Sequence, residues 1–126
     1  MELKTKIYLV DENDDKFMGL GVVWLLEKIQ EKRSLRAAAA NLGISYSKAY
    51  TMIAKLEKSL SKAVLVRRKG GTSRVGATLT PFGITLLDKY KVFHSSMKEI
   101  TKAPYEVFAA DFNKILSEFD EDGDIK

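Results

Sequence analysis

The sequence contains no cysteine and only one histidine among its 126 residues. The absence of cysteine excludes disulfide frameworks and metal sites built from thiolates. A single histidine leaves little basis for zinc binding or for acid–base catalysis. We therefore expect no metal, no cofactor and no enzymatic activity.

Long apolar runs are also missing, and the longest is Val22–Leu26. A helix that spans a membrane needs roughly 20 apolar residues. The chain also opens without the pattern of a signal peptide. We expect a cytoplasmic protein that does not bind membranes.

Two acidic segments have the alternating spacing of calcium ligands, but neither completes a calcium site. Residues 11–15 are followed by Lys16, where an EF-hand loop has glycine, and Val22 stands where the loop has its last glutamate. The acidic residues at 120–124 give a similar false signal. We interpret 11–15 as a polar turn.

Positive charge is concentrated in one part of the chain. Residues 45–75 contain eight lysines and arginines, and Glu57 is their only acidic residue. This segment therefore has a net charge of +7, whereas the whole chain has a net charge of +4. The remaining residues together carry −3. Such a distribution indicates a surface that binds a polyanion.

The first part of the chain predicts two short strands and a helix. Residues 4–10 are rich in β-branched and aromatic side chains, and a second short strand follows at 17–18. From residue 20 to 31, apolar residues recur with the spacing of an amphipathic helix.

Two further helices, joined by a turn, follow in residues 34–60. Ser34 is a suitable N-cap for the first, and Gly43 can end it in the left-handed conformation. Ser45 caps the second. Ala39 is small enough for the two helices to touch, so the segment predicts a helix-turn-helix.

The helix that begins after Ser45 has two different faces. The inward stripe is apolar and consists of Ala49, Ile53, Leu56 and Leu60. Tyr50 lies near this stripe, and we favour a place in the core over a DNA contact for it. The outward face is polar or basic, as in helices whose N-terminal residues read base edges in the major groove. The predicted DNA contacts of this helix are Ser45, Tyr46, Ser47, Lys48, Thr51 and Lys55.

A glycine-rich hairpin is predicted between strands at 64–68 and 77–79. Its glycines let the backbone approach phosphates or enter the minor groove. We expect this hairpin to be the wing of a winged helix-turn-helix. The predicted wing contacts are Arg67, Arg68, Lys69 and Arg74.

A fourth helix opens at Thr80 and Pro81, which are suited to the N-cap and first helical positions. Its apolar stripe has the 4-3-4-3 spacing of a short heptad seam. The stripe could be ordinary core, but we favour a dimer interface. Its members are Leu86, Tyr90, Phe93, Met97 and Ile100.

Pro104 is expected to break or restart the chain before a fifth helix with the same spacing. The apolar residues of that helix are Phe108, Phe112, Ile115 and Phe119. We thus predict a mainly α fold with a small β component, in three parts. These are a DNA-binding domain at 1–80, a helical dimerisation extension at 81–119 and a disordered acidic tail at 120–126.

Residues 34–50, SLRAAAANLGISYSKAY, resemble the N-terminal domain of the molybdate-dependent transcriptional regulators of ModE type. That family has a similar Gly-Ile-Ser-Tyr segment and an aromatic residue four positions later, usually tryptophan, where this chain has Tyr50. The segments Lys69-Gly-Gly and Leu79-Thr-Pro-Phe-Gly83 are also similar. LysR-type regulators resemble the chain more distantly through the Leu-Thr-x-x-Gly ending.

The resemblance covers roughly residues 7 to 90 and implies a winged-helix fold, a homodimer and binding to promoter DNA. In that family the molybdate-sensing domains are β-rich and follow this unit, whereas this chain ends in a helix and an acidic tail. We therefore expect no response to molybdate. The alternative function is a protein-interaction module whose basic face binds an acidic partner.

Overall fold

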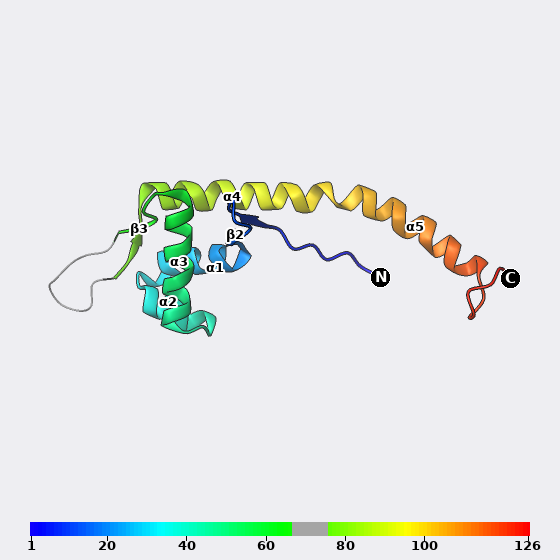
Figure 1. The fold of residues 1–126 in the computed structure, drawn as a ribbon, viewed down its shortest axis with the longest axis horizontal. Helices are drawn as coiled ribbons and strands as arrows, with labels where there is room; N and C mark the ends of the chain where they lie inside the picture. Colours follow the sequence, from blue (N-terminus) through cyan, green and yellow to red (C-terminus); the bar gives the residue numbers. More distant parts are fainter. Residues whose placement is uncertain (67–75) are drawn as a thin grey trace. The chain divides into compact units, whose positions relative to one another are not determined.

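A computed structural model of the chain describes residues 1–66 and 76–126 (Figure 1). The predicted wing contacts Arg67, Arg68, Lys69 and Arg74 lie outside the described residues. The chain forms two compact units. The first comprises Ile7–Lys91, and the second combines Met1–Lys6 with Val92–Lys126.

The fold is mainly helical, with two small antiparallel sheets, as expected for a winged helix-turn-helix. One sheet pairs β1 with β2, and the other pairs β3 with β4. The strands are β1 (Tyr8–Val10), β2 (Lys16–Gly19), β3 (Leu65–Val66) and β4 (Thr78–Leu79). The helices are α1 (Leu20–Lys32), α2 (Leu35–Leu42), α3 (Tyr46–Leu60), α4 (Pro81–Ile100) and α5 (Lys102–Glu118).

The first strand is shorter than the predicted strand at 4–10, because β1 begins only at Tyr8. Its partner β2 has only four residues, and these pair with residues 8–10, so the residues before Tyr8 have no strand beside them in this sheet. The polar turn between them is confirmed, since the Asp11 side chain accepts hydrogen bonds from the N–H groups of Asn13 and Asp15.

The ends of α2 and α3 confirm the capping residues predicted from the sequence. The Ser34 hydroxyl accepts a hydrogen bond from the N–H of Ala37, and the Ser45 hydroxyl accepts one from Lys48, each at 3.0 Å. Gly43 ends α2 with φ +71°, in the left-handed region that favours glycine. Local sequence signals therefore fix where both helices begin and where α2 ends.

Apolar side chains from α1, α2 and α3 meet in one core. Those of Ala38 and Ala39 in α2 and Ala49 in α3 are buried, and their small size lets these helices pack closely. The predicted inward stripe of α3 is confirmed for Ile53 and Leu56, which are fully buried. The other fully buried large side chains include Met18, Leu25, Leu26, Ile29, Val64 and Leu87.

The first half of α4 belongs to this core, and it includes two residues of the predicted dimer seam. Tyr90 is only 4% exposed, and its hydroxyl donates to the carbonyl oxygen of Ile7 at 3.1 Å. Burial also raises the pKa of the Tyr90 hydroxyl. Leu86 is partly buried and packs against the same core. Tyr90 is therefore a core residue of its own chain.

The second unit contains the end of α4 and all of α5. The two helices are separated at Thr101, and Pro104 lies in the first turn of α5, not at the break itself. Pro104 has no N–H to bond the carbonyl oxygen of Ile100, so the helical hydrogen bonds cannot run unbroken from α4 into α5. The predicted restart of the helix is confirmed.

The end of the chain differs from the expectation of a helical Phe119 and a disordered tail. Helix α5 ends at Glu118, and Phe119 pairs with Ile125 in an antiparallel bridge. Between them, the Asp120 side chain accepts hydrogen bonds from the N–H groups of Asp122 and Asp124. Because the side chain and the carbonyl oxygen of Asp120 both accept from the backbone N–H groups that follow, residues 120–124 form a turn.

A close backbone approach joins α4 to the segment that precedes β3. A Cβ atom added at Gly83 would lie 2.5 Å from the carbonyl oxygen of Val64. Thr80 bonds to the same segment, because its N–H donates to Val64 and its hydroxyl donates to Ala63 at 2.7 Å. The Thr80 hydroxyl also accepts from the N–H of Gly83, which confirms Thr80 as the N-cap of α4.

We expect Gly83→Ala to lower the free energy of unfolding by about 1–3 kcal/mol, since the added methyl group would force α4 away from Val64. Urea denaturation followed by circular dichroism measures the change. Gly21→Ala in α1 is the matched control, because its Cβ would meet Met52 at an ordinary 3.7 Å. Equal stability of the two variants would contradict this account of Gly83.

Candidate nucleic-acid interface

The outward face of α3 carries the side chains that the sequence predicts to contact DNA. Ser45, Tyr46, Ser47, Lys48, Thr51 and Lys55 are all exposed. Helix α3 lies in the described helix-turn-helix beside α2 (Figure 1). Because the opposite face of α3 is packed in the core, this polar and basic face is available to a ligand.

Tyr50 lies on the surface, which corrects its placement in the core. Its side chain is 49% exposed, and its ring centroid is 6.3 Å from that of Tyr46, one turn earlier in α3. The small Ala49 beside it fills the inward position. Since helical spacing alone places Tyr50 at the margin of the apolar stripe, only the packing of neighbouring helices shows that it is exposed.

Arg36 is a candidate interface residue that the sequence reasoning missed. It lies in the first turn of α2, and its guanidinium carbon is 4.4 Å from the ring centroid of Tyr46. Arg36 is itself exposed. Its position two residues after the N-cap Ser34 was visible in the sequence, but its contact with α3 depends on the tertiary fold.

The electrostatic environment of these residues is strongly positive. No aspartate or glutamate occurs between Lys32 and Leu56, a range that includes all of α2 and most of α3. The nearest acidic residues along the chain are Glu31 and Glu57. A negatively charged ligand on this face would therefore meet several cations and no carboxylate of α2 or of the first part of α3.

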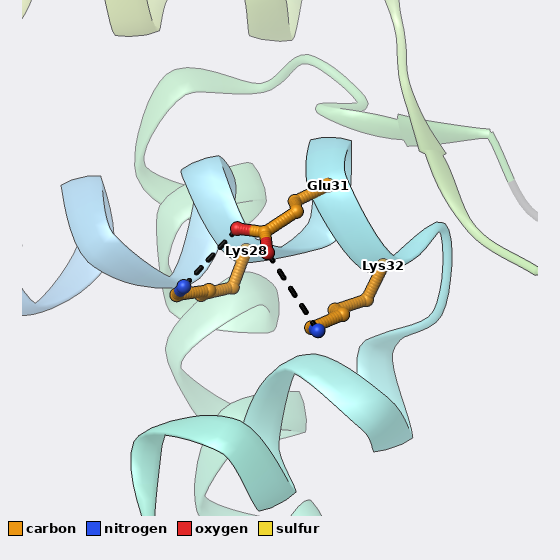
Figure 2. A network of polar contacts seen from close by, with 3 residues as sticks. All are labelled: Lys28, Glu31 and Lys32. Carbon is orange, nitrogen blue, oxygen red and sulfur yellow. Dashed lines mark hydrogen bonds and ion pairs between the residues drawn. The ribbon is translucent and has the colours of Figure 1, made fainter.

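Glu31 forms a small ion-pair network at the end of α1 (Figure 2). Its two carboxylate oxygens lie 3.1 Å from the Lys28 ammonium and 3.6 Å from that of Lys32. The hydrogen bond from Lys28 is the main reason why the pKa of Glu31 is lowered. These groups are on the surface, so water and salt screen the network and it adds little stability.

Glu57 holds the first wing strand to the end of α3. Its carboxylate accepts hydrogen bonds from the N–H groups of Val64 at 2.8 Å and of Leu65 at 3.3 Å. These partly buried donors would otherwise lack an acceptor at this point. The only acidic residue of the basic segment 45–75 thus fixes β3 relative to α3.

The second wing strand is preceded by another close backbone contact. A Cβ atom at Gly76 would overlap the carbonyl oxygen of Arg33 at 1.5 Å. Arg33 ends α1 with φ +57°, so its carbonyl group faces the strand that leads into β4. Only glycine allows so close an approach of the two backbones. The segment that leads into β4 is therefore packed against the end of α1.

In residues 1–66 and 76–126, no group of three or more His, Asp or Glu side chains is arranged to hold a metal ion. Among the helices of the described chain, none combines the length and apolar character needed to cross a membrane.

Comparison with known proteins relates the helix-turn-helix to a known family. Residues 23–84 match the sequence model described as "Bacterial regulatory helix-turn-helix protein, lysR family". This segment is similar to the helix-turn-helix domains of that family. The match begins in α1 and ends in α4, so it includes α2, α3 and both wing strands. The resemblance to LysR-type regulators seen in the sequence is confirmed.

A curated relative matches a longer part of the chain. The molybdenum-pterin-binding protein MopB of Rhodobacter capsulatus is 33% identical over 98 residues. The match covers 71% of this chain and 36% of the relative. The chain thus spans about a third of the length of that protein, whose name describes the binding of molybdenum-pterin.

Two solved structures confirm the winged-helix fold. The DNA-binding domain of CbnR, in complex with DNA, has a TM-score of 0.55 and 20% identity, and the match covers 71% of this chain and 99% of that one. The DNA-binding domain of BenM, in complex with catB site 1 DNA, has a TM-score of 0.55 and 19% identity, with coverage of 75% and 96%.

We expect Glu57→Ala to destabilise the lysR-type domain by about 1–3 kcal/mol, because two backbone donors lose their acceptor. Glu57→Gln keeps an acceptor oxygen and should lose less than half as much. Urea denaturation compares these variants with Lys58→Ala, an exposed neighbour expected to stay within about 0.5 kcal/mol of the original protein. A loss for Glu57→Ala no larger than for Lys58→Ala would contradict the structural role of this carboxylate.

Proposed function

We propose that this chain is a sequence-specific DNA-binding transcriptional regulator that acts as a homodimer. The observation that carries the proposal is the exposed face of α3, which is polar and basic along its length and begins at a capped N-terminus. A helix of this kind fits the major groove, where its first residues reach base edges. The lysR-family match and the DNA complexes of similar fold support the same function.

The proposed interface divides its work between α3 and the wing. Ser47 and Lys48 lie in the first turn of α3, where the Ser47 hydroxyl can donate to or accept from base edges and the Lys48 ammonium can donate to them. The predicted wing contacts, Arg67, Arg68, Lys69 and Arg74, are suited to phosphates because charge–phosphate contacts position a protein without reading sequence. We propose no enzymatic activity for this chain.

Binding to selected DNA duplexes tests this division. Ser47→Ala or Lys48→Ala should relax the preference for particular base pairs, at a cost of about 1–3 kcal/mol where a bidentate contact is lost. Arg67→Ala or Arg74→Ala should weaken binding to all sequences alike and reduce the dependence of affinity on salt. Fluorescence anisotropy with preferred and scrambled duplexes measures both effects.

Uniform losses from both groups of variants would contradict the division of labour. An acidic protein partner is the alternative to DNA, because the same basic face could bind it. Failure of the original protein to bind any duplex at low salt would favour that alternative, since sequence-independent binding alone should be measurable there.

The dimer is supported by apolar side chains that a single chain leaves in water. In the last part of α4, Phe93 is 41% exposed and Ile100 is 63% exposed, while Met97 is partly covered. Helix α5 contains no buried residue. Its exposed apolar side chains include the stacked pair Phe108 and Phe112, whose ring centroids are 5.2 Å apart. We propose that a second copy of the chain covers these surfaces.

We expect Phe93→Asp to convert the dimer into a monomer at micromolar concentration. Burial of one large apolar side chain contributes roughly 1.5–3 kcal/mol, and a charge at the same place would also have to be desolvated. Light scattering measures the mass, with Ser95→Asp as an exposed control on the same helix. If the original protein already has the mass of one chain, and Phe93→Asp leaves it unchanged, the seam is refuted.

A further inference from the structure

The contact between Arg36 and Tyr46 joins the two helices of the helix-turn-helix on their exposed side. Arg36 comes from the first turn of α2, and Tyr46 is the first residue of α3. The distance of 4.4 Å from the guanidinium carbon to the ring centroid is that of a cation–π pair. Buried alanines join the same two helices on their inner side.

This contact does not serve the core, because both side chains are on the surface. Tyr46 is 41% exposed, and Arg36 is exposed as well. An exposed cation–π pair is worth only a small amount of stability. Its main effect is to restrict a long, flexible arginine to one orientation, which lowers the entropic cost when that arginine binds a ligand.

The chemistry of an arginine held over an aromatic ring indicates what the ligand is. When the face of the guanidinium lies on an aromatic ring, the N–H donors at its edges still point outward in the plane. These donors match the oxygens of a phosphate group, which arginine binds in a bidentate manner. In a helix-turn-helix on DNA, the first helix crosses the sugar–phosphate backbone while the second enters the groove.

We propose that Arg36 binds a phosphate of the DNA backbone and that Tyr46 is the positioning residue that orients it. This inference rests on the proposed DNA-binding function and adds a contact from α2 to it. The pair places a phosphate contact directly beside the N-terminus of α3. It therefore sets how deeply and at what register the recognition helix enters the major groove.

A salt titration with a random-sequence duplex tests the phosphate contact, because such a contact does not depend on base sequence. Arg36→Gln should reduce the slope of log affinity against log salt by about 0.9, which corresponds to one phosphate contact. At 0.15 M salt this change alone lowers affinity about fivefold. Arg36→Lys keeps the charge and should keep the slope.

Lys28→Gln is the charge-matched control, since it removes one cation from α1, where Lys28 pairs with Glu31. It should leave the slope unchanged. Circular dichroism confirms that each variant is folded, which is expected because Arg36 is exposed. Loss of slope in Arg36→Gln but not in Lys28→Gln supports the contact, and equal slopes in all variants overturn it.

A double-mutant cycle tests the role of Tyr46. Tyr46→Ala should weaken binding about two- to fivefold in the original protein, since a cation–π contact of this strength is lost. It should have at most half that effect when Arg36 is already glutamine. Tyr46→Phe keeps the ring and should keep the coupling. Additive losses would overturn the positioning role.

The outcomes also separate this inference from the proposed function. If the original protein binds no duplex, the function itself fails. If it binds DNA with a salt slope that Arg36→Gln does not change, DNA binding stands and only the assignment of Arg36 is wrong.

Discussion

The arrangement of the winged-helix unit depends on the backbone of Val64. Its N–H donates to Glu57 of α3, its carbonyl oxygen accepts from the N–H of Thr80, and its peptide lies against Gly83 of α4. One residue thus connects the recognition helix, the first wing strand and the fourth helix. Two of these contacts are hydrogen bonds, which need a narrow range of distance and angle, and the third is a close backbone approach. A displacement of the Val64 backbone would therefore disturb all three contacts.

This junction also explains how a strongly basic segment can fold. In residues 45–75, the single carboxylate of Glu57 binds the backbone donors that lead into β3. The cations of α3 lie on the exposed face, where water solvates them until a polyanion replaces that water. The fold of this region is therefore stabilised by backbone groups, by Glu57 and by the close approaches at Gly76 and Gly83. The cations of α3 do not take part in these contacts and are free to bind a ligand.

Features that depend on neighbours in the sequence could be predicted, and those that depend on tertiary contacts could not. Ser34 and Ser45 cap helices through residues three positions away, so their roles follow from local sequence. The hydroxyl of Tyr90 binds Ile7, 83 positions earlier, and no spacing rule reveals that contact. Tyr50 is likewise exposed because of how α2 and α3 pack. The contact of Arg36 with α3 has the same origin.

The stripe of α4 shows why a regular pattern can have two meanings. Leu86 and Tyr90 face the core of their own chain, whereas Phe93 and Ile100, at the same spacing, are exposed. The 4-3 spacing reports only that one side of the helix is apolar, and it does not say what covers that side. The core ends where the winged-helix unit ends, at Lys91. The part of the stripe that its own chain leaves exposed therefore lies beyond that residue. We propose that a second chain covers this part, and a charge placed at Phe93 tests the proposal without disturbing the core around Tyr90.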